Sequence, residues 1–453
     1  MDVLLLAAVL LPAVLLRVVG ARSGLPLPLL NPDETNIVPR AWELVHGGGL
    51  DPGWYDYPSL VFLLVAPTQV ALDEPSYGTA RVVAVGLGLA GVVAAWWLGR
   101  VSAGRLAGLT CAAVVAVATT HVAYSRMAVT DVALTVGVTA CLALIATGRL
   151  EWAGVVAGLA ASAKYPGVLL LVPLVVAGLA LRRRLARALA LMVAAFLITS
   201  PFVALHADES WADFRRVQSL ARDGWLGFED DPATPLAFGL RLWETIGPVA
   251  LVGFLGLGIA IRRRTRSDLV LLSFGVTYAL SLLGSNAHFD RYLLPLLPVL
   301  AVLASRVPPL AVATLALAIV PLWWSVADAR SLATRDRRVD AAAWIERFVP
   351  PDERLAADPS TLSLQGRPVT RLELPGPGRP FDVDRDLDRL RAGGVRWLVV
   401  GGAVTDRVLA AADAYPREAR FYRGLTRLTP VYEVEGDEGR PSRPWLRVYR
   451  VYP

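Results

Sequence analysis

The acidic pair Asp33-Glu34 is the first place in this chain where neighbouring side chains could do chemistry. Pro32 precedes the pair, and apolar residues follow it at helical spacing until three glycines at 47–49 end the pattern. Asp33 has two compatible interpretations. Its carboxylate could cap the first turn of the predicted helix. The helix could also hold Asp33 in place as a general base, with Glu34 beside it.

Three further segments combine charge with long apolar neighbours. Asp131 begins an apolar run and follows Arg126, so the two form either a helix-terminal acid with a surface partner or a functional ionisable pair at a membrane. Lys164, the only lysine in the chain, is either a snorkelling residue or a cation that holds a phosphate. Arg291 is either an interfacial anchor or a phosphate clamp, since its planar fork binds two oxygens at once.

The composition places these residues in a membrane protein. Hydrophobic residues make up 55% of the 453 residues and charged residues only 19%, and the mean hydropathy is +0.50; soluble proteins carry about 25% charged residues. Two isolated cysteines and four scattered histidines predict neither a disulfide framework nor a metal site. The net charge of +6 comes without a basic stripe interleaved with aromatic residues, so we expect no nucleic-acid partner.

The apolar runs predict an α-helical polytopic protein with about eleven transmembrane helices. We place them at residues 3–19, 79–98, 106–123, 131–147, 152–162, 165–181, 187–206, 246–261, 268–284, 291–305 and 309–326. The run at 58–72 is short and contains Pro67, so we expect a helix at or dipping into the outer interface instead of a span.

Arginine counts set the predicted orientation. With a cytoplasmic N-terminus, the short inside loops hold Arg100, Arg105, Arg149, Arg182, Arg183, Arg184, Arg187, Arg262, Arg263, Arg264, Arg266 and Arg306. The short outside turns hold chiefly Arg126, Lys164 and Arg291, as the positive-inside rule requires. The loops 20–78 and 207–245 and everything after residue 328 then face outward. All four charged segments fall on this outer face.

The chain divides into a predicted membrane-embedded catalytic domain at residues 1–327 and a small extracytoplasmic α/β domain at 328–453. Apolar runs shrink to strand length in the second part. We expect strands at 354–357, 395–400, 430–434 and 446–451, and helices at 341–348, 384–391 and 405–412.

The order of the motifs resembles the GT-C superfamily of polyprenyl-phosphate-sugar-dependent glycosyltransferases, in particular the protein O-mannosyltransferase and ArnT-like branch (family 39-like). The resemblance covers most of residues 1–326. It rests on Asp33-Glu34 in a long first outer loop, Tyr57-Pro58-Ser59-Leu60, Tyr124-Ser125-Arg126 through Asp131, Lys164-Tyr165-Pro166-Gly167, and the run from Arg291 to Pro298. Where family members often have Lys- or Tyr-Pro-Pro, this chain has Tyr57-Pro58-Ser59.

The resemblance implies an enzyme of the cell membrane that moves a sugar from a polyprenyl phosphate to an acceptor hydroxyl of a protein, lipid or glycan, with inversion. Asp33 would be the catalytic acid of the first loop, and Asp131 would help to arrange the site. Lys164, Arg126 and Arg291 are the expected cations for the departing phosphate. No nucleotide is expected, and a divalent metal on the acids is not expected to be essential.

Aromatic side chains of the outer loops could also contact the donor or the acceptor. Tyr57 or Tyr55 could supply a hydroxyl to the donor phosphate or the sugar. Trp225, in the loop 207–245, could stack on the acceptor or belong to an interfacial belt of tryptophans. The alternative function is a transporter or flippase of lipid-linked sugars, which would place its ionisable residues near the middle of the membrane within broken spans.

Overall fold

The computed structural model describes residues 2–362, 364, 367–436 and 443–452. The chain forms two compact units. The first comprises Met1–Arg22, Asp33–Ser219 and Ala233–Ala333, and the second comprises Ser23–Pro32, Leu220–Pro232 and Thr334–Pro453. Two segments from the predicted outer loops, 23–32 and 220–232, therefore belong to the same unit as the tail.

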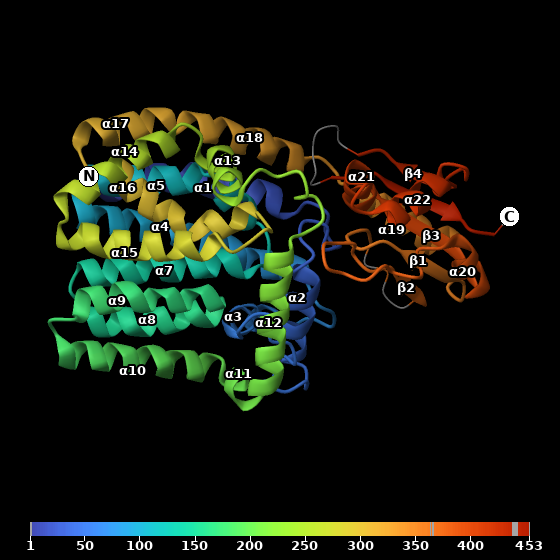
Figure 1. The fold of residues 1–453 in the computed structure, drawn as a ribbon, viewed down its shortest axis with the longest axis horizontal. Coiled ribbons are helices and arrows are strands. Elements are labelled where there is room, and N and C mark those ends of the chain that lie inside the picture. The colour runs from blue at the N-terminus through green and yellow to red at the C-terminus, as the bar shows by residue number, and fades with distance from the viewer. Residues whose placement is uncertain (1, 363, 365–366, 437–442, 453) are drawn as a thin grey trace. The chain divides into compact units, whose positions relative to one another are not determined.

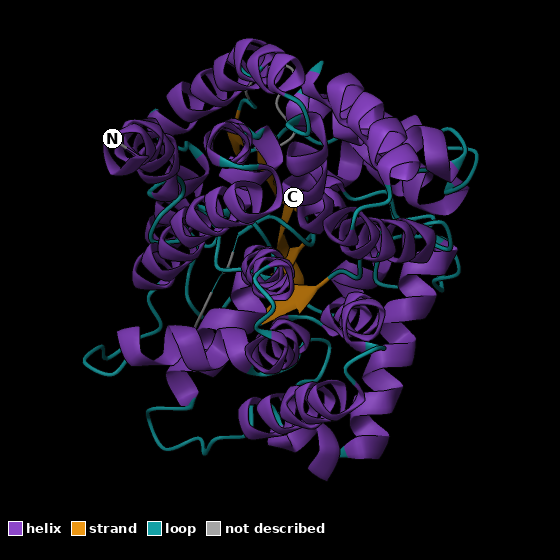
Figure 2. Ribbon diagram, turned by 90° about the vertical axis from the view of Figure 1, so that its left-hand side faces the viewer, coloured by secondary structure: helices purple, strands orange, loops and turns teal. Residues whose placement is uncertain are grey.

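The first unit is helical (Figures 1 and 2). Its α-helices are α1 (Asp2–Ala21), α2 (Glu34–Glu43), α3 (Leu60–Val65), α4 (Tyr77–Ala103), α5 (Arg105–Val117), α6 (Thr119–Tyr124), α7 (Thr130–Ala146), α8 (Leu150–Ala163), α9 (Leu171–Gly178), α10 (Arg182–Thr199), α11 (Pro201–Leu205), α12 (Ala207–Asp223), α13 (Thr234–Ile246), α14 (Val249–Arg263), α15 (Arg266–Leu282), α16 (Leu297–Ala304), α17 (Pro308–Leu317) and α18 (Ile319–Ala333). Its 3-10 helices are η1 (Ala66–Thr68), η2 (Tyr165–Leu170) and η3 (Asp290–Leu296).

The long apolar helices lie side by side along one direction, and Figure 2 views many of them close to end-on. The start of α10 and the end of α14, where the triple-arginine clusters 182–184 and 262–264 lie, are at one end of this bundle (Figure 1). Helices α2, α3 and α12 lie at the other end. The arginine clusters and the acidic pair are thus at opposite ends, as the charge pattern predicted. Which side of the membrane each end faces stays a prediction.

Small residues set how closely the helices pack. Gly154 and Gly158, four residues apart on α8, face α10. A Cβ atom at Gly154 would lie 2.1 Å from the carbonyl oxygen of Ala188, and one at Gly158 would lie 2.2 Å from that of Met192. Close backbone approach through a small-xxx-small pattern is typical of helices that associate inside membranes, where apolar burial alone gives no driving force.

Length and composition identify three helical stretches able to cross a membrane within the described chain: Leu4–Ala21, Tyr77–Ala103 and Pro308–Leu332. A fourth would be the pair α13 and α14, which is bent by 115°. Most other predicted spans are shorter helices or begin as a 3-10 turn, and α10 has 18 residues but carries four arginines. The 3-10 helices η2 and η3 contain Pro166 and Pro295, which remove backbone donors. The count of eleven spans stays a prediction. Helix α3 has six residues, about 9 Å, and is too short to cross.

The second unit is an α/β domain around a five-stranded mixed sheet of order β2-β1-β3-β5-β4. Strands β1 (Arg354–Ala357), β2 (Val369–Arg371) and β3 (Val395–Gly401) are parallel, and β5 (Leu446–Arg450) runs antiparallel to β3 and to β4 (Tyr432–Val434). The four predicted strands are present, and β2 was not predicted. The helices are α19 (Arg338–Phe348), α20 (Leu387–Ala392), α21 (Gly402–Ala410) and the unpredicted α22 (Pro416–Leu425).

Both faces of this sheet are covered. On β3, Leu398 and Val400 belong to one apolar core, which includes side chains of α20, α21 and α22. Trp397 and Val399 point to the other face and belong to a second core with α19. Alternate residues of a strand face opposite sides, so a central strand covered on both sides is apolar along its covered length, which here runs from Trp397 to Val400.

Candidate active site

Asp33 stands directly before α2, yet its side chain does not cap that helix. Its Oδ2 atom accepts a hydrogen bond from the Tyr57 hydroxyl at 3.2 Å and lies 3.4 Å from Nη1 of Arg291. The side chains of Asp33 and Arg291 are 19% and 14% exposed, so the carboxylate is held but still accessible. The capping interpretation of Asp33 is therefore wrong, and the side chain faces other charged groups.

Asp131 and Lys164 form the second half of the cluster. Lys164 Nζ donates to Oδ1 of Asp131 at 2.6 Å. The same ammonium lies 5.3 Å from the ring centre of Tyr57 and 5.5 Å from that of Tyr292, within the range of a cation–π contact. The shared Tyr57 joins this pair to Asp33. The cluster thus contains two carboxylates, two cations and two phenols.

Hydrogen-bonding capacity is left over in this cluster. Among the described residues, Oδ2 of Asp131 and Nε of Arg291 are buried without a hydrogen-bond partner. A buried polar atom without a partner costs about 1–3 kcal/mol, and native proteins keep few of them. Two such atoms in one cluster leave an acceptor and a donor available to a ligand.

The local sequence explains how Lys164 is presented. Lys164 follows the last residue of α8 in an extended conformation (φ −159°, ψ 136°), and Pro166, which has no backbone N–H to continue the helical hydrogen bonds, lies in the first turn of η2. Gly167 then packs directly on the end of α8: a Cβ there would lie 2.4 Å from the backbone of Ala160 and Ala161. Only glycine fits, so the Lys-Tyr-Pro-Gly segment folds back tightly and fixes the lysine at the helix end.

Asp290 holds Arg291 and was not selected from the sequence. Its carboxylate accepts hydrogen bonds from the Tyr124 hydroxyl at 3.1 Å, the Thr120 hydroxyl at 3.1 Å and the backbone N–H of Arg291 at 2.8 Å. These contacts join η3 to α6. The sequence signal was present, since Asp290 and Tyr124 both lie within the charged segments, but those segments were interpreted through Arg126, Asp131 and Arg291.

A polar network fastens the loop that carries Tyr57. The Tyr55 hydroxyl donates to Asp51 at 2.9 Å, and the Tyr55 backbone N–H donates to Asp213 of α12 at 3.1 Å. Arg216 of α12 pairs with Asp56. The hydroxyl and backbone N–H of Tyr55 are thus engaged in holding the loop to α12. Burial raises the pKa of Asp56 to about 6, although the charge of Arg216 opposes the shift.

Glu34, predicted beside Asp33, points away from the cluster. Its two oxygens accept from Nε and Nη2 of Arg81 at 2.8 and 2.7 Å, and one also accepts the backbone N–H of Ala128 at 3.0 Å. Its side chain is 0% exposed. Every contact of this carboxylate holds helices together, and none leaves it open to a substrate.

Arg126 and Trp225 also lie elsewhere than the sequence suggested. Arg126 is buried, donates to the carbonyl oxygen of Leu16 and pairs with Asp328, so it joins α1, the turn after α6 and α18. Trp225 belongs to the second unit, where it packs against the apolar core and under the guanidinium of Arg379, 4.5 Å from its ring centre. The loop 207–245 that contains it is largely helical, as α12 and α13.

The part of the chain that the structure describes contains no group of three or more His, Cys, Asp or Glu side chains able to hold a metal ion. The two carboxylates of the cluster are each matched with a cation instead. Whether the reaction needs a metal remains a prediction from the sequence.

The fold is shared with solved membrane glycosyltransferases. ArnT from Cupriavidus metallidurans in the apo state superposes with a TM-score of 0.62 at 17% identity, over 98% of this chain and 97% of that one. The same protein bound to undecaprenyl phosphate gives 0.58, again at 17% identity and over 98% and 97% of the two chains. The apo oligosaccharyltransferase of Archaeoglobus fulgidus gives 0.60 at 11% identity, over 91% of this chain and 71% of that one.

The apolar helices and the shared fold therefore define a multi-pass membrane protein built like these glycosyltransferases. A family model matches residues 54–286, just over half of the chain, and the chain belongs to glycosyltransferase family 87. No curated protein sequence matches it. The prediction of an enzyme is confirmed, and the transporter or flippase alternative is not supported.

Proposed function

We propose that the protein transfers a sugar from a polyprenyl-phosphate donor to a hydroxyl of an acceptor, with inversion at the anomeric carbon. Family membership supports the transfer of a sugar. The donor class is supported by two proteins of the same fold: ArnT was solved with undecaprenyl phosphate, and AglB of Archaeoglobus fulgidus was solved with a dolichol phosphate and an inhibitory peptide.

Asp33 is the proposed general base. The acceptor oxygen forms the new bond to the anomeric carbon while its proton passes to Asp33. The bond between that carbon and the phosphate oxygen breaks, and the phosphate leaves on the lipid with its negative charge. Tyr57 and Arg291 both contact Oδ2 of Asp33, so they orient the carboxylate before the acceptor arrives. General-base help of this kind typically contributes about 10²–10⁴-fold.

Lys164 and Arg291 are the proposed cations for the departing phosphate. Fixed charges in a site with little water stabilise developing charge strongly. Asp131 acts through Lys164, which it holds by the 2.6 Å contact. The unpartnered Nε of Arg291 is a donor that phosphate oxygens could use. Arg126 is not part of this proposal, because its donors are engaged within the protein.

One observation carries the proposal. Segments far apart in the sequence — the start of α2, the loop before α3, the start of α7, the end of α8, and η3 — bring Asp33, Tyr57, Asp131, Lys164 and Arg291 into one cluster with unused hydrogen-bonding capacity. The chemistry needs a carboxylate beside cations, and this cluster provides both. By the arginine counts, the cluster faces the extracytoplasmic side of the cell membrane.

The test is sugar transfer by the purified protein in liposomes with a panel of labelled polyprenyl-phosphate sugars. Release of free polyprenyl phosphate is the readout. We expect turnover with one donor, and we expect Asp33→Asn to lower the rate by about 10²–10⁴-fold. Asp73→Asn alters an exposed acid of the same outer region and should turn over at the wild-type rate. Full activity in Asp33→Asn would move the base to another residue. Labelled lipid that crosses the bilayer uncleaved would contradict the proposal.

A further inference from the structure

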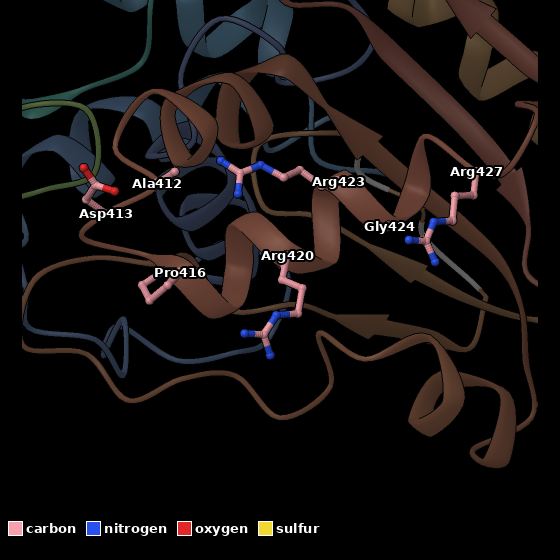
Figure 3. A pocket seen from close by; sticks show the side chains of 7 residues that line it. All are labelled: Ala412, Asp413, Pro416, Arg420, Arg423, Gly424 and Arg427. Carbon is pink, nitrogen blue, oxygen red and sulfur yellow. The ribbon is translucent and has the colours of Figure 1, made fainter.

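The second unit carries an open hollow of about 650 Å³ against α22, lined by Ala412, Asp413, Pro416, Arg420, Arg423, Gly424 and Arg427. Three of its seven lining residues are arginines, and Figure 3 shows Arg420 and Arg423 extending from α22 and Arg427 from the turn beyond it. Arg420 and Arg423 are three residues apart on α22, so their side chains project from the same face of the helix.

The helix is built to present this face. Phe421, Tyr422 and Leu425 of α22 point into the apolar core of the unit, while Arg420, Arg423 and Arg427 are exposed. The floor beside them is formed by small residues and a proline, so the guanidinium groups are not covered by long neighbours.

These arginines differ from others in the same unit. Arg385, Arg389 and Arg396 each pair with a carboxylate. Within the described ranges, no side-chain hydrogen bond or ion pair involves Arg420, Arg423 or Arg427. Asp413 is the single acid of the lining. Three neighbouring cations without partners repel one another, and an anion in the hollow would remove that repulsion.

We propose that this hollow binds an acidic glycan, a short run of sugars that carries carboxylate or phosphate groups. Each guanidinium offers two parallel donors to such a group. A volume of about 650 Å³ suits a ligand of a few sugar rings. The lining has no large apolar or aromatic anchor, which disfavours a peptide partner held by buried side chains. The link to glycosyl transfer, in which this glycan serves as acceptor, rests on the proposed function; the binding itself does not.

The test is titration calorimetry of the full-length protein in detergent with a galacturonic acid tetrasaccharide. A neutral glucose tetrasaccharide, inorganic phosphate and glycerol 1-phosphate, the headgroup unit of an anionic lipid, are the comparison ligands. We expect saturable binding of the acidic tetrasaccharide alone, weakened by salt. In Arg420→Gln/Arg423→Gln the affinity falls at least about tenfold, since one charged hydrogen bond contributes about that much.

The matched control is Arg337→Gln/Arg371→Gln, which removes the same charge from exposed positions elsewhere in the unit and should bind normally. Equal loss in both double variants would overturn the proposal, because net charge alone would then explain binding. Equal or tighter binding of phosphate or glycerol 1-phosphate would also overturn it, in favour of a simple phosphate or lipid headgroup. Asp33→Asn should bind the tetrasaccharide as wild type does, so a failure of the catalytic proposal leaves this one testable.

Discussion

Asp33 and Glu34 are adjacent in the chain, but their carboxylates lie in two different environments. Glu34 and Arg81 are completely buried, and the pair uses both carboxylate oxygens, three guanidinium nitrogens and a backbone N–H. The cluster around Asp33 is more open, its contact to Arg291 is 3.4 Å long, and Asp131 keeps an unpartnered oxygen. A complete pair holds a fold together, whereas an incomplete one leaves bonds for a ligand.

The largest effect should come from breaking the complete pair. In Glu34→Gln, Arg81 keeps its charge in a buried site without a counter-ion, which typically costs about 3–5 kcal/mol. We expect the lowest thermal unfolding midpoint of any variant considered, measured in detergent by loss of soluble protein. Glu43→Gln changes an exposed acid of the same helix and should unfold like wild type. A stable but inactive Glu34→Gln would mean that Glu34 belongs to the chemistry after all.

The next largest effect should come from Lys164, where variants can separate a loss of activity from a loss of stability. Lys164→Gln removes a proposed phosphate cation and should slow transfer by about 10²–10³-fold. It also leaves Asp131 buried without its partner, so the protein should be less stable. Adding Asp131→Asn removes that unpaired charge. The double variant should therefore regain stability without regaining activity, as a double-mutant cycle on both quantities would measure. Recovery of activity together with stability would make Lys164 a structural residue.

The sequence predicted most members of the cluster because each interrupts an apolar run. Asp131, Lys164 and Arg291 stand out on that ground alone, and arginine counts group them at one end of the helices. The sequence did not show that Asp33 and Glu34 have different roles. The direction in which each side chain points depends on distant residues: Glu34 pairs with Arg81, 47 residues further along the chain, and Asp33 contacts Tyr57. Arg126 was selected by the same rule, but its partners Leu16 and Asp328 are distant in the chain.

For the fold as well, features set by local sequence were predicted, and features set by distant contacts were not. Long apolar runs predicted helices, and alternating short runs predicted four of the five strands. Helix α12 was missed although Trp211, Phe214 and Val217 repeat every three residues and acids stand at its first turn. Segments 23–32 and 220–232 belong to the second unit, and their own sequence does not predict this. The assignment depends on packing against residues far along the chain.

A smaller effect should follow from loosening Arg291 without removing it. Asp290→Asn keeps the shape of a side chain that accepts from Thr120, Tyr124 and the backbone of Arg291, but removes its charge. One hydrogen bond to a charged group is worth about 1.5–3 kcal/mol, so we expect transfer to slow by about tenfold or more. Steady-state transfer rates, with Asp73→Asn as the control, measure this. Wild-type rates in Asp290→Asn would show that Arg291 is positioned without it.

The smallest effect concerns the loop that carries Tyr57, where burial and an ion pair compete at Asp56. Burial raises the pKa of Asp56 to about 6, whereas the charge of Arg216 acts to lower it. The unfolded pKa is about 4, so the folded protein holds a proton on Asp56 between about pH 4 and 6. The contribution of this proton to stability is then fully present below pH 4 and is lost as the pH rises through 6.

The variant Asp56→Asn cannot titrate at this position and serves as the reference. As the pH rises from 4 to 6, the unfolding midpoint of wild type should fall relative to that of Asp56→Asn, by a few degrees at most. Other titrating groups are common to both proteins and cancel in the difference. If the midpoint of wild type instead rose relative to that of Asp56→Asn, the charge of Arg216 would outweigh burial. The ion pair that holds the loop to α12 would then resemble the complete pair of Glu34 and Arg81 more than the open cluster around Asp33.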